Sequence, residues 1–142
     1  MSDSSSGQDS SAAFWVQPKE TEVDSGQLAF PLGVYQVSDL PKFEPAPGIV
    51  MSVMSGGRSM ANWVKIEPNT GVPLHSHPHE QLGLVLEGQI TMKMGGGEHV
   101  LTPGSCYRIP GNLPHEAVSG PNGCLVVDIF APLREEYVAA AK

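Results

Sequence analysis

The chain has 142 residues, 40% of them hydrophobic, which is enough for one compact domain and too little for two. Fifteen acidic residues against eight basic ones give a net charge of −7, which argues against nucleic acid or an anionic membrane as a partner. No apolar run approaches the roughly 20 residues of a membrane span. A small-molecule ligand fits this composition better, and an anionic one needs basic residues inside its site. The candidates for that task are Arg58, Lys65, Arg108 and Arg134.

The two cysteines, Cys106 and Cys124, fall in segments with strand character, where we expect both side chains to be buried. Two cysteines without a signal peptide favour reduced thiols over a disulfide scaffold. The sequence therefore predicts a cytoplasmic protein.

The first 48 residues differ in composition from the rest. Residues 1–12 are serine-rich and almost free of bulky apolar side chains, so we expect a disordered tail. Residues 13–48 form an N-terminal arm in which five prolines exclude a long helix, and short strands are expected around 29–30 and 33–37. The arm has more apolar residues than a free tail would carry. We expect it to pack on the main body or on a second subunit, and thereby to contribute to a homodimer.

Residues 49–142 show the pattern of an all-β domain. Short apolar runs alternate with Gly, Pro and Asn, and no 3.6-residue period appears before the last ten residues. Tight turns are expected at Gly88 and at 95–97. Such strands most naturally close into a small β-barrel or double-sheet jelly roll, followed by a short helix over 133–140. The expected strands are 49–54, 59–67, 74–77, 82–87, 89–94, 98–101, 106–109, 115–118 and 124–130.

The segment from His75 to Gln81, HSHPHEQ, concentrates metal-ligand chemistry in seven residues. Side chains two apart in a strand point the same way, so His75 and His77 are expected to converge on one ion. Pro78 marks a strand end, after which His79 can be turned away.

A second group of polar residues lies in the expected strand 124–130. Asp128 and Phe130 share one face of that strand, and an aspartate among apolar neighbours is costly unless it is paired or functional. Two interpretations stay open. Asp128 lies at an edge or pairs with an arginine, or it is an acid inside the barrel aimed at a metal-held substrate. In the second case Arg134 is available to hold an anionic group.

The histidine segment resembles the first motif of the cupin superfamily, which runs glycine, five residues, His-x-His, three or four residues, glutamate, six residues, glycine. His75, His77 and Gly88 keep this spacing, with Gln81 where the acid usually stands. Asn69 occupies the leading glycine position, and asparagine tolerates the left-handed conformation best after glycine.

The second cupin motif runs glycine, five residues, proline-x-glycine, two residues, histidine, three residues, asparagine. Gly104, Pro110 and His115 match it, whereas Asn112 replaces a glycine and Ser119 the asparagine. The resemblance covers roughly residues 49–130 and implies the cupin barrel. The implied ligand set suits one divalent transition metal, such as Zn, Ni, Fe or Mn. It consists of His75, His77, Gln81 and His115.

Four stretches of the sequence are similar to the KdgF family of small cupins. They are HxHPHEQ, LEG, IP with a following PH, and DxFxPxRExY. That resemblance implies conversion of 4,5-unsaturated uronates to linear ketouronates by metal-assisted acid–base catalysis. It assigns catalysis to Asp128, Phe130 and Arg134. Two other classes of function stay open, because fold does not determine function. One is a metal-dependent dioxygenase or lyase acting on another small substrate. The other is a non-catalytic metal- or ligand-binding cupin, which a solvent-facing Asp128 would favour.

Overall fold

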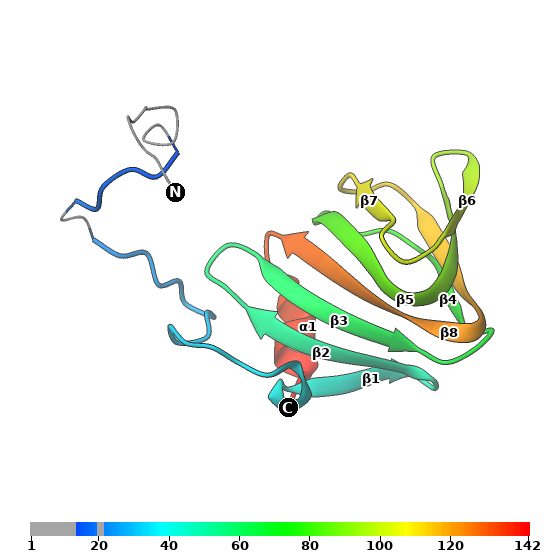
Figure 1. Cartoon of the computed structure of the whole chain (residues 1–142), viewed down its shortest axis with the longest axis horizontal. Helices are drawn as coiled ribbons and strands as arrows, with labels where there is room; N and C mark the ends of the chain where they lie inside the picture. Colours follow the sequence, from blue (N-terminus) through cyan, green and yellow to red (C-terminus); the bar gives the residue numbers. More distant parts are fainter. Residues whose placement is uncertain (1–13, 20–21) are drawn as a thin grey trace, which may run out of the picture.

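Eight strands, all paired antiparallel, dominate this computed structural model, which describes residues 14–19 and 22–142 (Figure 1). The tail predicted for residues 1–12 lies outside the described residues. A short 3-10 helix, Val37–Asp39, precedes the sheet, and the predicted C-terminal helix is confirmed as α1 (Glu135–Ala140). The strands are β1 (Lys42–Ala46), β2 (Ile49–Ser55), β3 (Met60–Ile66), β4 (Gly71–His75), β5 (Glu80–Met94), β6 (Gly97–Leu101), β7 (Cys106–Ile109) and β8 (His115–Ala131).

Two long bent strands, β5 and β8, each join two strands that the sequence predicted separately. They pair along most of their length, with register shifts between Val85 and Glu87 and between Gly88 and Ile90. Gly88 has a φ of +74°, and a Cβ there would lie 2.0 Å from the carbonyl oxygen of Gly123. The expected turn at Gly88 is therefore wrong. The glycine instead allows the register shift at which the continuous strand bends.

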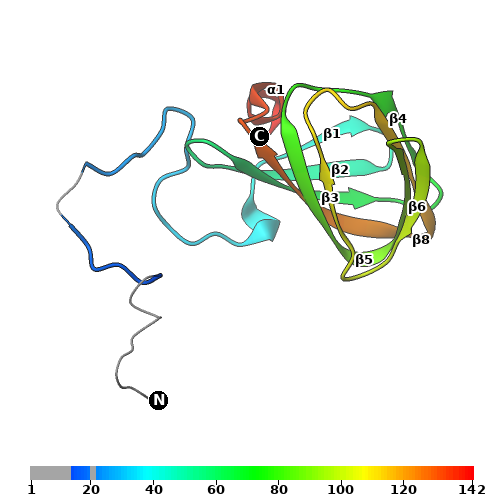
Figure 2. The same cartoon turned by 90° about the horizontal axis from the view of Figure 1, so that it is seen from above.

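The sheet follows the order β1-β2-β3-β8-β5-β6, with β4 added on β8 and β7 on β5. Its path ends at β1 and β6, so within the described residues the sheet curls without closing (Figure 2). This is a jelly roll, as predicted. The inward-facing side chains form the core, whose main cluster is Ile49, Val64, Ile66, Val85, Ile90, Cys124 and Val126.

The arm contributes one strand to the sheet, but at a different place from the prediction. No strand forms over residues 29–37, where Pro31 lacks the N–H that a ladder needs. Instead β1 pairs with β2. The arm is tied to the end of β2 by a hydrogen bond from the Phe30 amide to the Ser55 carbonyl, 2.8 Å long. Residues 22–29, before that point, run away from the sheet (Figures 1 and 2).

The two cysteines are free, and only one is buried. Cys124 lies in the core as predicted, whereas Cys106 is exposed, because it lies on the outward side of the short strand β7. In the part of the chain that the structure describes, no helix has the length and apolar character needed to cross a membrane.

Candidate metal centre

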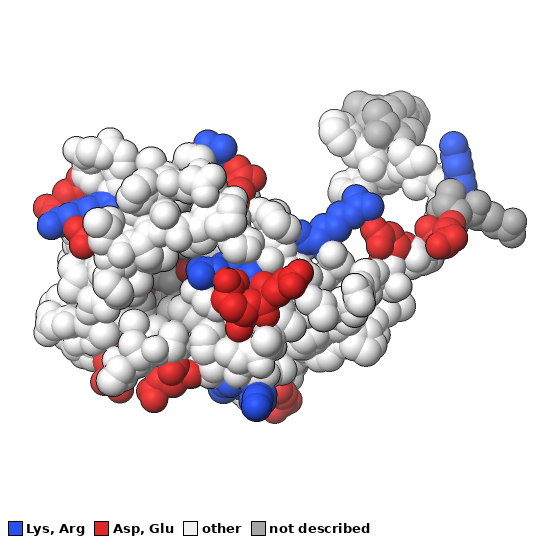
Figure 3. All heavy atoms as spheres, turned by 180° about the vertical axis from the view of Figure 1, so that it is seen from behind, with Lys and Arg blue, Asp and Glu red and all other residues white. Residues whose placement is uncertain are grey.

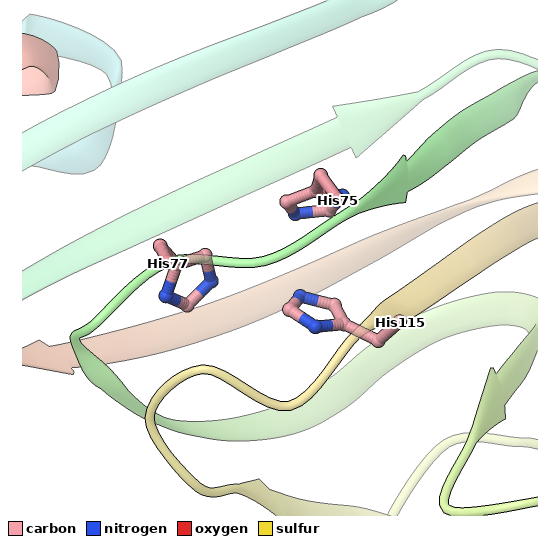
Figure 4. A group of neighbouring side chains, drawn as sticks. All are labelled: His75, His77 and His115. Carbon is pink, nitrogen blue, oxygen red and sulfur yellow. The ribbon is translucent and has the colours of Figure 1, made fainter.

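Three histidines from two adjacent segments converge on one point (Figure 4). His75 ends β4 and lies opposite His115, the first residue of β8, while His77 follows in the loop after β4. The ring centroids of His75 and His115 are 4.3 Å apart, and those of His77 and His115 are 5.1 Å apart. One ring nitrogen from each histidine lies within 4.8 Å of the others, which is close enough to share one metal ion. His79 does not belong to this cluster.

Backbone carbonyls fix the tautomer of all three rings. Their Nδ1 atoms lie 2.7, 3.0 and 2.8 Å from carbonyl oxygens close by in the sequence. A carbonyl only accepts, so Nδ1 donates the proton and Nε2 keeps its lone pair. The Nε2 atom of His115 is buried without a hydrogen-bond partner. Histidines that bind metals are commonly oriented in this way, so these rings fit a divalent transition metal.

The loops that hold the histidines pack tightly on each other. The Asn112 amide donates a 2.7 Å hydrogen bond to the His77 carbonyl, and a Cβ on Gly111 would lie 2.4 Å from the Pro78 oxygen. Asn112 and Asn69, which replace motif glycines, have φ values of +69° and +53°. Asparagine thus keeps the left-handed backbone that each motif requires.

Burial favours the neutral form of two of these rings, His77 and His115. The pKa of His77 is lowered from 6.5 to about 4, mainly by burial and in addition by the positive charge of Arg134. Burial also lowers the pKa of His115. A neutral imidazole is the form that binds a metal, so these two rings need no deprotonation near pH 7.

Gln81 is buried beside the cluster, with its Oε1 3.1 Å from the Nε2 of His77. Both atoms are acceptors when the ring proton is on Nδ1, so a cation between or near them would relieve their repulsion. The Gln81 side chain also acts to lower the pKa of Asp128, as expected if the NH₂ end of the amide faces the carboxylate. Glu80 points the other way and pairs with Arg108 at 2.8 Å.

Asp128 lies inside the sheet between β3 and β5, which excludes the edge position. It is 9% exposed and accepts a 2.5 Å hydrogen bond from the Tyr107 hydroxyl. Burial raises the pKa of Asp128 from 3.8 to about 6, although hydrogen bonds from Tyr107 and Gln81 act to lower it. Sequence reasoning missed Tyr107. The available signal was Gly83 inside a strand, because a Cβ there would lie 2.0 Å from the Tyr107 ring.

Arg134 is held between two aromatic rings. Its guanidinium carbon lies 3.9 Å from the centroid of Tyr137 and 5.2 Å from that of Phe130. Its Nη1 donates a 2.7 Å hydrogen bond to the Tyr137 hydroxyl, and its Nε lies 3.4 Å from Glu136. These contacts hold a cationic side chain of which 12% is exposed. The sequence motif included Tyr137 but assigned it no role, because that role depends on how α1 folds back.

Of the four basic residues that the sequence offered for an anionic ligand, Arg134 alone lines the cavity at the metal centre. Arg58 and Arg108 form 2.8 Å ion pairs with Asp24 and Glu80. On the face of the molecule in Figure 3, acidic and basic side chains are interspersed.

One cavity brings most of these groups together. His77 borders it through a contact with Phe130, whose ring centroid lies 5.5 Å away. The predicted site residues in its wall are His75, Gln81, His115, Asp128, Phe130 and Arg134. Much of the remaining wall is apolar, and includes Met51, Val64, Ile66, Ile90, Met92 and Val126.

Residues 62–130 match the family model described as Cupin domain. Among solved structures, the chain is similar to KdgF from Halomonas sp., with 26% identity, a TM-score of 0.68, and coverage of 73% of this chain and 96% of that chain. An RmlC-like cupin from Shewanella frigidimarina is 22% identical, with a TM-score of 0.68 and coverage of 81% and 99%. A cupin-superfamily sugar phosphate isomerase from Silicibacter pomeroyi is 16% identical, with a TM-score of 0.60 and coverage of 71% and 76%. The last two likenesses show the fold alone. No curated protein matches the chain.

Proposed function

The chain belongs to the cupin superfamily, and from the site inside its jelly roll we propose that it is a metal-dependent enzyme acting on a small molecule. The observation that supports this most is the buried, unpartnered Nε2 atom of His115 within a cluster of three histidines. A buried lone pair without a donor is costly, and a metal ion satisfies it.

The proposed ligands are the Nε2 atoms of His75, His77 and His115 and the Oε1 atom of Gln81. All four donors are neutral, so the set suits Zn, Ni, Fe or Mn without cancelling the charge of the ion. When bound, such an ion supplies Lewis acidity that polarises a substrate hydroxyl or carbonyl oxygen.

For the substrate we propose a 4,5-unsaturated uronate, as the resemblance to KdgF suggests. Its conversion to a linear ketouronate is an isomerisation, so no oxidant or reductant is needed. The hemiacetal proton leaves, the bond between C1 and the ring oxygen breaks, and the resulting enol becomes a ketone as C4 gains a proton.

Asp128 is the proposed proton-transfer group, since its pKa of about 6 lies near neutral pH, where a group can both accept and donate a proton. Tyr107 holds its carboxylate in place. Arg134 binds the substrate carboxylate, and Phe130 forms an apolar wall beside His77. The burial of Asp128 argues against a purely non-catalytic module, because an unused buried carboxylate is costly.

We also propose that the chain is a homodimer to which the N-terminal arm contributes. The support is the high exposure of apolar side chains in that arm, including Phe14 and Trp15 at 79% and 76%.

Metal content of protein purified without a chelating column tests the first part of the proposal. We expect about one divalent ion per chain in the wild type and loss of most of it in His75→Ala and His115→Ala. His99→Ala is the matched control, because His99 is exposed and lies outside the cluster. Unchanged metal content in both cluster variants, measured by mass spectrometry after dialysis, would contradict the ligand assignment.

Turnover tests the second part. We expect loss of the ultraviolet absorbance of a 4,5-unsaturated uronate, with a linear ketouronate identified by NMR. If the metal-loaded wild type consumes neither galacturonate- nor mannuronate-derived substrate, the uronate proposal is wrong. Iron-dependent oxygen uptake would then point to a dioxygenase.

A further inference from the structure

Asn62 is a polar residue at a core position of the central strand β3. The inward-facing residues of β3 are Met60, Asn62, Val64 and Ile66, and all four are buried. Asparagine is disfavoured in strands, and a polar residue in such an apolar row needs a local reason. Asn62 is 0% exposed and lies directly opposite Asp128 on β8.

The Asn62 amide is only half satisfied. Its Nδ2 donates to the thioether sulfur of Met51 at 3.3 Å, whereas its Oδ1 has no hydrogen-bond partner. A thioether is an acceptor only, so the NH₂ end of the amide must face Met51 and the carbonyl end remains unpaired. Burying such a carbonyl destabilises the folded chain, and an apolar side chain of the same shape would avoid that loss. The strand thus keeps an unfavourable group at a point where packing alone favours another residue.

The position of Asn62 supplies the reason. It lines the same cavity as His75, Asp128 and Arg134. The same cavity wall holds an acid and the histidine cluster. An acceptor there that lacks a protein donor is suited to accept a hydrogen bond from a bound ligand.

We infer that Asn62 is a ligand-binding residue whose Oδ1 accepts a hydrogen bond from a hydroxyl group of the molecule in the cavity. The inference deepens the proposed function and rests on it for the place where the ligand sits. The donor is a hydroxyl, because the proposed substrate carries hydroxyl groups and no amine. The ligand class is therefore a hydroxylated carboxylate rather than an apolar acid.

The first test uses the ligand-free protein with its metal. Leucine has the branching of asparagine without its polar atoms, so Asn62→Leu removes the unpaired carbonyl and keeps the shape. We expect the melting temperature to rise by about 3 °C. A structural role for the amide predicts the opposite, so a melting temperature several degrees below that of the wild type overturns the inference.

The second test compares two probes by calorimetry on the metal-loaded protein. D-galacturonate and tetrahydropyran-2-carboxylate share a six-membered ring and a carboxylate, but the second probe has no hydroxyl groups. We expect the wild type to prefer D-galacturonate and Asn62→Leu to reduce that preference about tenfold or more. Lys65→Ala is the control, because Lys65 is exposed on the outward face of the same strand and does not line the cavity, so this variant should keep the preference.

An unchanged preference in Asn62→Leu overturns the inference, as does equal affinity of the wild type for both probes. Neither test measures turnover. A wild type that fails to consume unsaturated uronates would therefore contradict the proposed reaction while leaving the role of Asn62 to be decided by these two measurements.

Discussion

Asp128 and Arg134 contribute different groups to one cavity, and their substitution should change different kinetic constants. A proton-transfer group acts in the transition state, so Asp128→Asn should keep the metal and lower kcat by ~100-fold or more. A clamp that binds ground and transition states alike changes affinity, so Arg134→Ala should mainly raise KM. Steady-state kinetics on the metal-loaded variants measures both constants.

Arg58→Ala is a suitable control for these kinetics, since Arg58 is a surface arginine paired with Asp24 and does not line the cavity. A kcat within a fewfold of the wild type in Asp128→Asn would show that another group moves the proton. An unchanged KM in Arg134→Ala would remove the carboxylate clamp.

The buried ionisable groups also predict how the stability of the metal-free protein depends on pH. Folding lowers the pKa of His77 from 6.5 to about 4, so the unfolded chain binds more protons and stability falls as the pH drops through that window. Folding raises the pKa of Asp128 from 3.8 to about 6, so the folded chain binds more protons and stability rises as the pH drops through nearly the same window. The two effects oppose each other.

Removing the carboxylate should therefore expose the effect of the histidine. Between pH 7 and pH 4.5, the free energy of unfolding of metal-free Asp128→Asn should fall by about 2 kcal/mol more than that of the wild type. Denaturant titrations at the two pH values measure this difference. Parallel loss of stability in the two proteins would mean that Asp128 is ionised in the folded state throughout this range.

At the scale of elements, the contact between β5 and β7 depends on the absence of a side chain at Gly83. Because a Cβ there would lie 2.0 Å from the Tyr107 ring, Gly83→Ala should displace the ring and break its hydrogen bond to Asp128. We expect a loss of about 1–3 kcal/mol in the free energy of unfolding, as is typical of overpacking, together with lower turnover.

Gly71→Ala in β4 is the matched control for this variant. A Cβ at Gly71 meets no atom closer than the Ala117 carbonyl oxygen at 4.0 Å, so the change should be nearly neutral. Equal stability of Gly83→Ala and Gly71→Ala in denaturant titrations would show that the ring of Tyr107 can move without cost.

The arrangement of these elements explains what the sequence could predict. His75 and His77 are two residues apart, so local geometry predicted that pair. His115 is distant in sequence and meets them through the pairing of β4 with β8, and only the resemblance to the second cupin motif predicted it. Tyr107 and Asn62 face Asp128 from β7 and β3, and their contacts depend on which strands pair and in which register. A single sequence does not specify that pairing.

The bent strands show a similar limit. Gly88 has a positive φ, as the turn prediction required, but β5 continues through it because β8 pairs with both halves of the strand. Local glycine signals are the same for a hairpin and for a strand irregularity, so only long-range pairing distinguishes them.

At the scale of the whole molecule, two apolar surfaces have no partner among the residues that the structure describes. One is the outer face of the sheet, where Leu82, Leu84 and Ile129 are 48%, 40% and 37% exposed. The other is the arm, where Leu32 and Val34 are almost fully exposed. The arm leaves the body beside the turn between β2 and β3, at the end of the same sheet (Figure 1). A second copy of the chain would cover both surfaces at once.

Deletion of residues 13–36 should therefore reduce the size of the particle from dimer to monomer in light scattering and lower its melting temperature. Deletion of residues 1–12 is the control and should change neither quantity. The arm is also tied to its own body through Phe30 and Ser55, so a lower melting temperature alone could arise within one chain. Particle size separates the two causes, because only a contact between copies makes size depend on the arm. If size and melting temperature both remain unaltered when residues 13–36 are removed, the arm has no part in assembly.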